Sequence, residues 1–196
     1  MTASPGVSLL RLLEVLDRLE IPYMIGGSGA SSVHGLTRTT ADLDLVVKMD
    51  AESVQPLVTE LRQDFYIDEQ QVRVALVSSR SFNVIHYQTS FKFDIFPLTE
   101  DRYQQVQFGR RRHEVASIFT GEPLELSVAS PEDVILSKLR WFRQGGEVSE
   151  QQWNDVLGVI AVQGDKLDLP YLREWAPSLG VTKLLEQALT EGQKSR

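Results

Sequence analysis

The chain has 196 residues, of which 42% are hydrophobic and 24% charged, proportions typical of a globular protein and not of a disordered or collagen-like chain. It has no cysteine and only three scattered histidines, which excludes disulfides, zinc–thiolate sites and iron–sulfur clusters and argues against a multi-histidine metal site. With 27 acidic and 20 basic side chains the net charge is −7, which argues against non-specific binding to duplex nucleic acid.

The first two thirds of the chain alternate predicted helices and strands. Leucines spaced three and four residues apart predict an amphipathic helix over residues 8–19, and Pro22 ends it because the residue before a proline is pushed out of the helical region. A glycine-rich turn and a short helix over 30–35 follow a first strand, and another amphipathic helix is expected over 54–62. Strands are expected at residues 23–25, 42–47, 72–77, 82–87, 91–97, 114–119 and 124–128.

The last third is predicted to be helical throughout. Ser130 followed by a proline and two acidic residues is a strong helix start, and the helix is expected to run to about Gln144. Further helices are expected at 149–161, 169–175 and 181–189. We therefore expect an α+β fold with a small mixed sheet flanked by helices, divided into domains of residues 1–128 and 129–196, the second a helical bundle.

Targeting patterns favour the cytoplasm. No apolar run approaches the ~20 residues that a helix needs to cross a bilayer, and the first residues lack the pattern of a signal peptide. We therefore expect a cytoplasmic protein with no membrane partner. The three tryptophans, Trp141, Trp153 and Trp175, stand at helical spacing among apolar residues and are expected in the core.

Three aspartates stand where a strand would not ordinarily hold a charge. Asp42 and Asp44 are two residues apart on a predicted strand, so their carboxylates project to the same face. At ~4 Å and an effective dielectric constant of ~20, their repulsion is on the order of 4 kcal/mol, which calls for a compensating cation such as magnesium. Asp94 stands among apolar residues on another predicted strand, where an isolated charge is costly. Each feature alone is more often structural, whereas three acids on neighbouring strands could hold two metal ions.

The order of these motifs carries a family resemblance. A Gly-Gly-Ser turn at residues 26–28, an Asp-x-Asp pair after 13 intervening residues and a separate aspartate resemble the DNA polymerase β-like nucleotidyltransferase superfamily. Within it, the run from Gly26 through His34-Gly35 to Asp44 is most similar to minimal bacterial and archaeal members of the abortive-infection type IV toxin group. The resemblance covers about residues 21–98, and the helical tail matches more weakly through Lys138 and Trp153-x-Asp155.

The resemblance implies a reaction and a set of catalytic residues. Asp42 and Asp44 would bind two Mg²⁺ ions that neutralise the triphosphate, and Asp94 would complete the second metal site and help to deprotonate an acceptor hydroxyl. That hydroxyl would attack the α-phosphorus of a nucleoside triphosphate and release pyrophosphate. Gly27 and Ser28 would hold the triphosphate at the start of the following helix.

Other residues admit two interpretations each. Arg38 either reaches the phosphates or the acceptor, or is a surface charge on a loop. Lys138 stands among apolar residues and, by the resemblance, contacts the triphosphate with Asp155 supporting it, although lysines also extend their amines outward from apolar faces. The basic run at residues 110–113 either guides an RNA or is a solvated strand.

The acceptor stays open at this stage. A tRNA is one candidate, a small molecule or a protein is a less favoured one, and a cognate antitoxin is a candidate partner. The alternative hypothesis is a catalytically silent nucleotide-binding or partner-binding module of the same fold. The three aspartates disfavour it, because a module without catalysis has no need of a costly acidic cluster.

Overall fold

The computed structural model describes residues 5–37 and 40–194 and divides the chain into two compact units. The first comprises Met1–Ile25 and Thr40–Val128, and the second comprises Gly26–Thr39 and Ala129–Arg196. One boundary thus lies between Val128 and Ala129, and residues 26–39 belong with the C-terminal helices although the sequence placed them in a domain of residues 1–128. Among the described residues, no helix is both long and apolar enough to cross a membrane.

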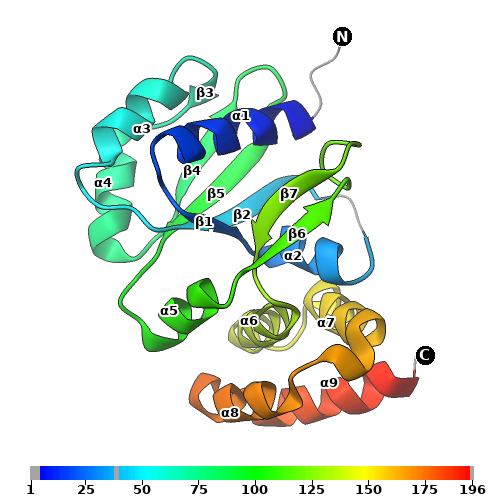
Figure 1. Ribbon diagram of the computed structural model, residues 1–196. Helices are drawn as coiled ribbons and strands as arrows, with labels where there is room; N and C mark the ends of the chain where they lie inside the picture. Colours follow the sequence, from blue (N-terminus) through cyan, green and yellow to red (C-terminus); the bar gives the residue numbers. More distant parts are fainter. Residues whose placement is uncertain (1–4, 38–39, 195–196) are drawn as a thin grey trace. The chain divides into compact units, whose positions relative to one another are not determined.

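A mixed seven-stranded sheet forms the first unit, in the order β3-β4-β5-β2-β1-β7-β6 (Figure 1). β2 is parallel to β5 and β1 is parallel to β7, and the other neighbouring strands are antiparallel. The sheet confirms the expected α+β class. Its strands are β1 (Tyr23–Ile25), β2 (Asp42–Val47), β3 (Phe65–Tyr66), β4 (Phe82–His86), β5 (Lys92–Pro97), β6 (Arg112–Ala116) and β7 (Leu124–Val128).

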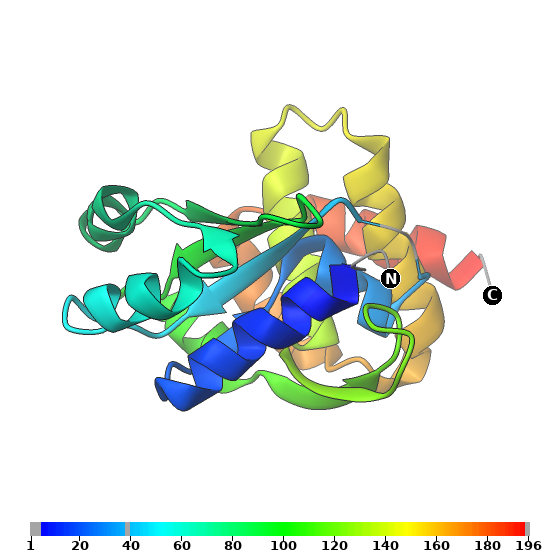
Figure 2. The same cartoon turned by 90° about the horizontal axis from the view of Figure 1, so that it is seen from above.

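Strict alternation along β2 and β5 gives the sheet one apolar face. Leu43, Leu45 and Phe93 are at most 2% exposed, and their neighbours along each strand are only half-buried. The helices α1 (Pro5–Arg18) and α3 (Val54–Leu61) run along one side of the sheet and contribute buried leucines to the core (Figures 1 and 2). The polar residues of β2 and β5 therefore lie together on the face opposite to this core.

Helices far apart in the sequence form the second unit. The short α2 (Gly27–His34) is held by His34, whose Nε2 lies 2.7 Å from the carbonyl oxygen of Ala129, and by Gln163, whose side-chain amide donates to the carbonyl oxygen of His34 at 2.7 Å. His34 is buried, so its role here is structural. The other helices are α6 (Pro131–Gln144), α7 (Glu150–Gln163), the 3₁₀ turn η1 (Gly164–Lys166), α8 (Leu169–Leu179) and α9 (Thr182–Lys194).

Three elements of the sheet region differ from the expectation. Residues 72–77 form no strand but belong to α4 (Glu69–Ser78), which the side chain of Asp68 caps by accepting from the backbone of Gln71. The helix α5 (Arg102–Gly109) was not expected, since its sequence is mostly polar and shows no clear apolar spacing. The first strand of the last hairpin is β6 at 112–116, so the expected range of 114–119 lies too far toward the C-terminus.

Candidate active site

The strand register brings the three aspartates to the same face of the sheet. In the parallel pair of β2 and β5, Asp44 lies opposite Asp94 and Asp42 lies opposite Lys92. Residues in register on neighbouring strands point the same way, and residues two apart on one strand share a face. Because Leu43 and Leu45 face the core, Asp42 and Asp44 face away from it, together with Asp94. We call these three side chains the acidic face.

Lys92 belongs to the same surface and bridges two of the aspartates. Its Nζ lies 2.7 Å from Oδ2 of Asp94 and 3.5 Å from Oδ2 of Asp42. The hydrogen bond to Asp94 raises the pKa of Lys92 above its ordinary value, with the charges of Asp94 and Asp42 adding to it and burial opposing it. The amine is therefore an ammonium ion at neutral pH. Sequence reasoning missed Lys92, although its position two residues before Asp94 places both side chains on one strand face.

The donor chemistry of the acidic face fits a hard divalent cation. Carboxylate oxygens are the ligands that Mg²⁺ prefers, and Asp42 is 44% exposed, so solvent and ligands can reach the surface. Within residues 5–37 and 40–194, however, no three acidic or histidine side chains are gathered closely enough to hold a metal ion as they stand. The ammonium of Lys92 supplies the positive charge beside Asp42 and Asp94 in this arrangement.

The glycine turn begins α2 earlier than the sequence suggested. Gly27 has φ of +50°, a left-handed backbone conformation that glycine adopts without the strain of a side chain. The amide of Ala30 donates to the carbonyl oxygen of Gly26 at 2.9 Å, and the hydroxyl of Ser31 donates to the carbonyl oxygen of Ser28 at 3.0 Å. The first amides of a helix have no partner within it and favour anions such as phosphate. The turn leaves β1 directly after Ile25, whose partner on β2 is Leu45.

The second unit brings together the two polar residues that the sequence singled out in the helical tail. Lys138 on α6 donates to Oδ2 of Asp155 on α7 at 2.7 Å and to the side-chain oxygen of Gln152 at 3.2 Å. The two charged side chains are only 3% and 9% exposed. In this arrangement the ammonium of Lys138 joins α6 to α7 through these two contacts. The remaining predicted residue, Arg38, lies outside the described residues.

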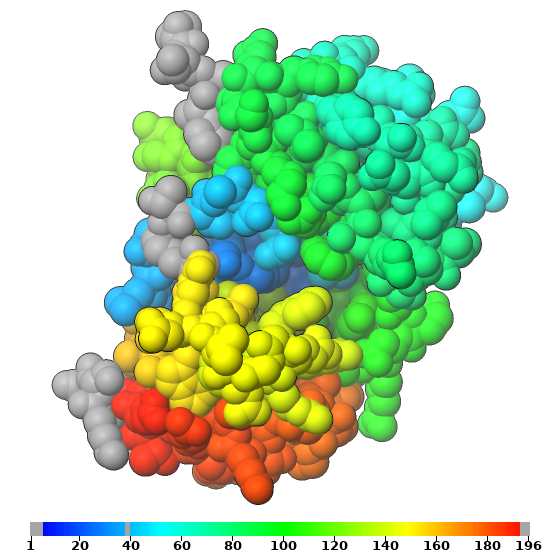
Figure 3. Space-filling view, turned by 180° about the vertical axis from the view of Figure 1, so that it is seen from behind, coloured from blue at the N-terminus to red at the C-terminus, as the bar shows by residue number. Residues whose placement is uncertain are grey.

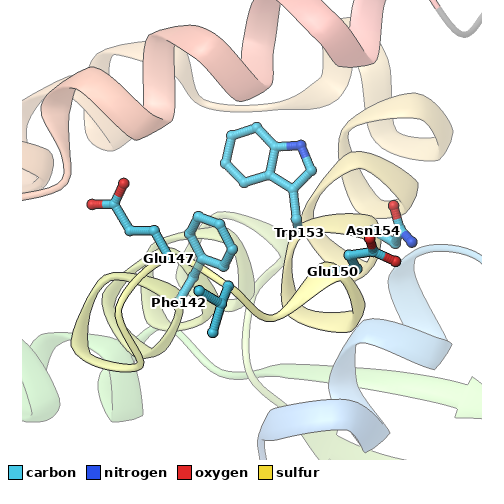
Figure 4. Close-up of a pocket in the computed structure, with 6 residues that line it drawn as sticks. Phe142, Glu147, Glu150, Trp153 and Asn154 are labelled. Atoms are coloured by element: carbon cyan, nitrogen blue, oxygen red, sulfur yellow. The ribbon is translucent and has the colours of Figure 1, made fainter.

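A separate pocket of about 230 Å³ lies within the second unit, where α6 turns into α7 (Figure 4). The rings of Phe142 and Trp153 lie with centroids 5.3 Å apart, and the indole nitrogen of Trp153 donates to Glu191 at 2.9 Å. The α6–α7 connection lies at the surface, visible as the yellow atoms of Figure 3. None of the predicted site residues lines the pocket, whose walls are Phe142, Glu147, Val148, Glu150, Trp153 and Asn154.

None of the three tryptophans is buried in the core as expected. Trp141 is 60% exposed and lies in the last turn of α6. Trp153 and Trp175 are half-buried.

Comparison with solved structures identifies the fold. The solution structure of the antibiotic-resistance factor ANT(2'')-Ia aligns over 100% of both chains with a TM-score of 0.56 and 14% identity. Its crystal structure in complex with adenylyl-2''-tobramycin aligns over 88% of this chain and 97% of that one, with a TM-score of 0.55 and 15% identity. An antigenic nucleotidyltransferase-like protein from Paracoccidioides brasiliensis covers 97% and 94%, with a TM-score of 0.52 and 16% identity. No protein-family model and no curated protein matches the sequence. The chain thus has the nucleotidyltransferase fold.

Proposed function

We propose that the protein is a magnesium-dependent nucleotidyltransferase, which moves a nucleoside monophosphate from a nucleoside triphosphate to an acceptor hydroxyl. The observation that carries the proposal is the acidic face: Asp42 and Asp44 on β2 and Asp94 on β5 share one side of two parallel strands, within the fold of known nucleotidyltransferases. Like charges at neighbouring positions are costly to a sheet, so their presence favours a use for them.

Each aspartate has a distinct part in the proposed reaction. Asp42 and Asp44 would hold Mg²⁺, which when bound neutralises the phosphates and lowers the cost of charge build-up at phosphorus. Asp94, only 19% exposed, would contribute to the second metal position and accept the proton of the acceptor hydroxyl. The acceptor oxygen then bonds to the α-phosphorus, the bond from that phosphorus to the bridging oxygen of the β-phosphate breaks, and pyrophosphate leaves.

The nucleotide would be held by residues outside the sheet. Gly27 and Ser28 begin α2, whose first amides suit phosphate oxygens. Lys138 would contribute a positive charge with Asp155 orienting it, and Arg38 is a further candidate for the phosphates. Because Lys138 is bound to Asp155, a phosphate contact requires the ammonium to share its hydrogen bonds between the two.

For the acceptor, we propose a chemical class and not a particular compound. ANT(2'')-Ia has been captured with an adenylylated antibiotic, which supports a small molecule bearing a hydroxyl group. A tRNA is the second candidate acceptor. The basic residues 110–113 favour it because they could contact its phosphates, whereas the net charge of −7 disfavours binding of a nucleic acid. A toxin role with a cognate antitoxin, and action in the cytoplasm, are proposals that depend on the resemblance and on the sequence pattern.

The test is transfer of label from nucleoside triphosphates, with and without magnesium. Acceptors to be compared are total RNA, a panel of hydroxyl-bearing antibiotics and the protein itself. Asp42→Asn and Asp94→Asn should each lower the transfer rate by about 100-fold or more, because a metal ligand or the proton acceptor is lost. Asp101→Asn is the matched control, since it removes one carboxylate from the same unit but asparagine still caps α5.

The alternative of a silent binding module makes the opposite prediction. Tight nucleotide binding with no transfer to any acceptor, unchanged by Asp42→Asn, would favour that module and contradict the proposed enzyme.

A further inference from the structure

The acidic face is held together by a positive charge of its own. Three carboxylates on one face of two adjacent strands repel one another, and the ammonium of Lys92 contacts two of them, at 2.7 Å from Asp94 and 3.5 Å from Asp42. The register opposite Asp42 places Lys92 on this face, so its presence there follows from the strand pairing and not from a chance side-chain conformation.

The strand neighbours supply no second cation. In the sheet, Asp94 has Asp44 on one side and Asn83 on the other, and Lys92 has Asp42 and Ile85. Lys92 is therefore the one positively charged side chain among the residues that the register of β2, β4 and β5 places beside Asp94 and Asp42.

We propose that Lys92 is a built-in counter-ion that occupies the acidic face without metal and thereby couples binding of the divalent cation to binding of the nucleotide. The inference rests on the proposed function. A divalent cation at these carboxylates would lie within a few ångströms of the ammonium, and the two positive charges repel. The ammonium also uses carboxylate oxygens that a metal needs.

The phosphates of a nucleotide remove this conflict. A triphosphate brings several negative charges, which attract both the divalent cation and the displaced ammonium. Metal and nucleotide therefore bind to the protein better together than either does alone. By linkage, each raises the affinity of the protein for the other by the same factor. Lys92 thus keeps the acidic face stable and free of metal until a nucleotide arrives.

The test measures Mn²⁺ binding to the full chain by the loss of its electron paramagnetic resonance signal, with and without a non-hydrolysable nucleoside triphosphate analogue. The wild type should bind Mn²⁺ weakly alone and more tightly with the analogue. In Lys92→Met, affinity for Mn²⁺ alone should rise about tenfold or more, and the gain on adding the analogue should shrink. Without metal, Lys92→Met should also unfold at a lower temperature than the wild type, because the positive charge that pairs with Asp42 and Asp94 is lost.

Two further variants separate charge from structure. Lys92→Arg keeps the positive charge and should keep the dependence on nucleotide. Lys48→Met removes a lysine just past the far end of β2, about 20 Å along the strand from Asp42, and should behave as the wild type.

The proposal is overturned if Lys92→Met, folded by circular dichroism, binds Mn²⁺ alone no better than the wild type. Its failure is distinguishable from failure of the proposed function. If the wild type transfers label and Asp42→Asn does not, while Lys92→Met binds Mn²⁺ with the same affinity as the wild type, only the counter-ion role is wrong. If no variant binds Mn²⁺ with the analogue present and no label is transferred, both are wrong.

Discussion

At the scale of single residues, the ion pair of Lys138 and Asp155 combines a structural and a proposed functional role. Both side chains are almost fully buried and lie 2.7 Å apart. Taking two charges out of water is expensive, and breaking such a pair leaves one of them uncompensated. We therefore predict that Asp155→Asn lowers the free energy of unfolding by about 3–5 kcal/mol, measured by urea denaturation.

The double variant Lys138→Met with Asp155→Leu tests the proposed role of this ion pair in nucleotide binding. It should recover most of the lost stability, because apolar side chains replace both charges. If Lys138 contacts the triphosphate, the double variant still loses nucleotide affinity. Glu69→Gln is the control, since its pair with Arg73 is exposed and should cost less than ~1 kcal/mol. A cost below ~1 kcal/mol for Asp155→Asn would contradict the prediction.

Residues were predictable where a charge contradicts its surroundings. Asp42, Asp44 and Asp94 are visible in the sequence because acids are rare within apolar strands, and the structure does place them on one face. Lys92 was missed because a lysine at a half-exposed strand position is ordinary, and only the register with β2 shows what it contacts. Their roles in metal and nucleotide binding stay predictions.

At the scale of elements, capping and amphipathic spacing were reliable and short apolar runs were not. Ser130 caps α6 as expected, with its hydroxyl accepting from the amide of Asp133. Residues 72–77 were expected to form a strand, but they belong to a helix with Val72 and Ala75 buried and Val77 86% exposed. A run of six residues is too short for periodicity alone to decide.

The close approach of α2 and α7 gives a prediction at this scale. A side chain at Gly35 would place its Cβ 2.8 Å from the backbone nitrogen of Val159 and 3.0 Å from the carbonyl carbon of Gly158. Since backbone cannot yield as a side chain can, Gly35→Ala should lower the free energy of unfolding by about 1–3 kcal/mol in urea denaturation. Gly145→Ala is the control, because its nearest neighbour lies at an ordinary 3.4 Å. Equal stability of the two variants would contradict the close approach.

At the scale of the whole molecule, the chain passes between the two units three times, after Ile25, Thr39 and Val128. Sequence patterns give the last of these boundaries, where strands give way to helices. They do not show that residues 26–39 join the helical unit, because that depends on contacts between segments 95 to 129 residues apart, such as those of His34 with Ala129 and Gln163. Such contacts leave no local pattern in the sequence.

This connectivity predicts how fragments behave. A fragment of residues 129–196 lacks α2 and therefore the contacts that α2 makes with α6 and α7. It should melt at a lower temperature and less cooperatively than the same fragment joined through a flexible linker to residues 26–39, as measured by circular dichroism at 222 nm. The reason is that α2 is mostly buried, and its loss exposes the surfaces of α6 and α7 that it covers. His34→Ala in the joined fragment is the matched variant, because it removes the buried imidazole and its bond to Ala129 and should lower the melting temperature part of the way toward that of the fragment without α2. Identical melting of the two fragments would show instead that α6–α9 form a complete folding unit without α2.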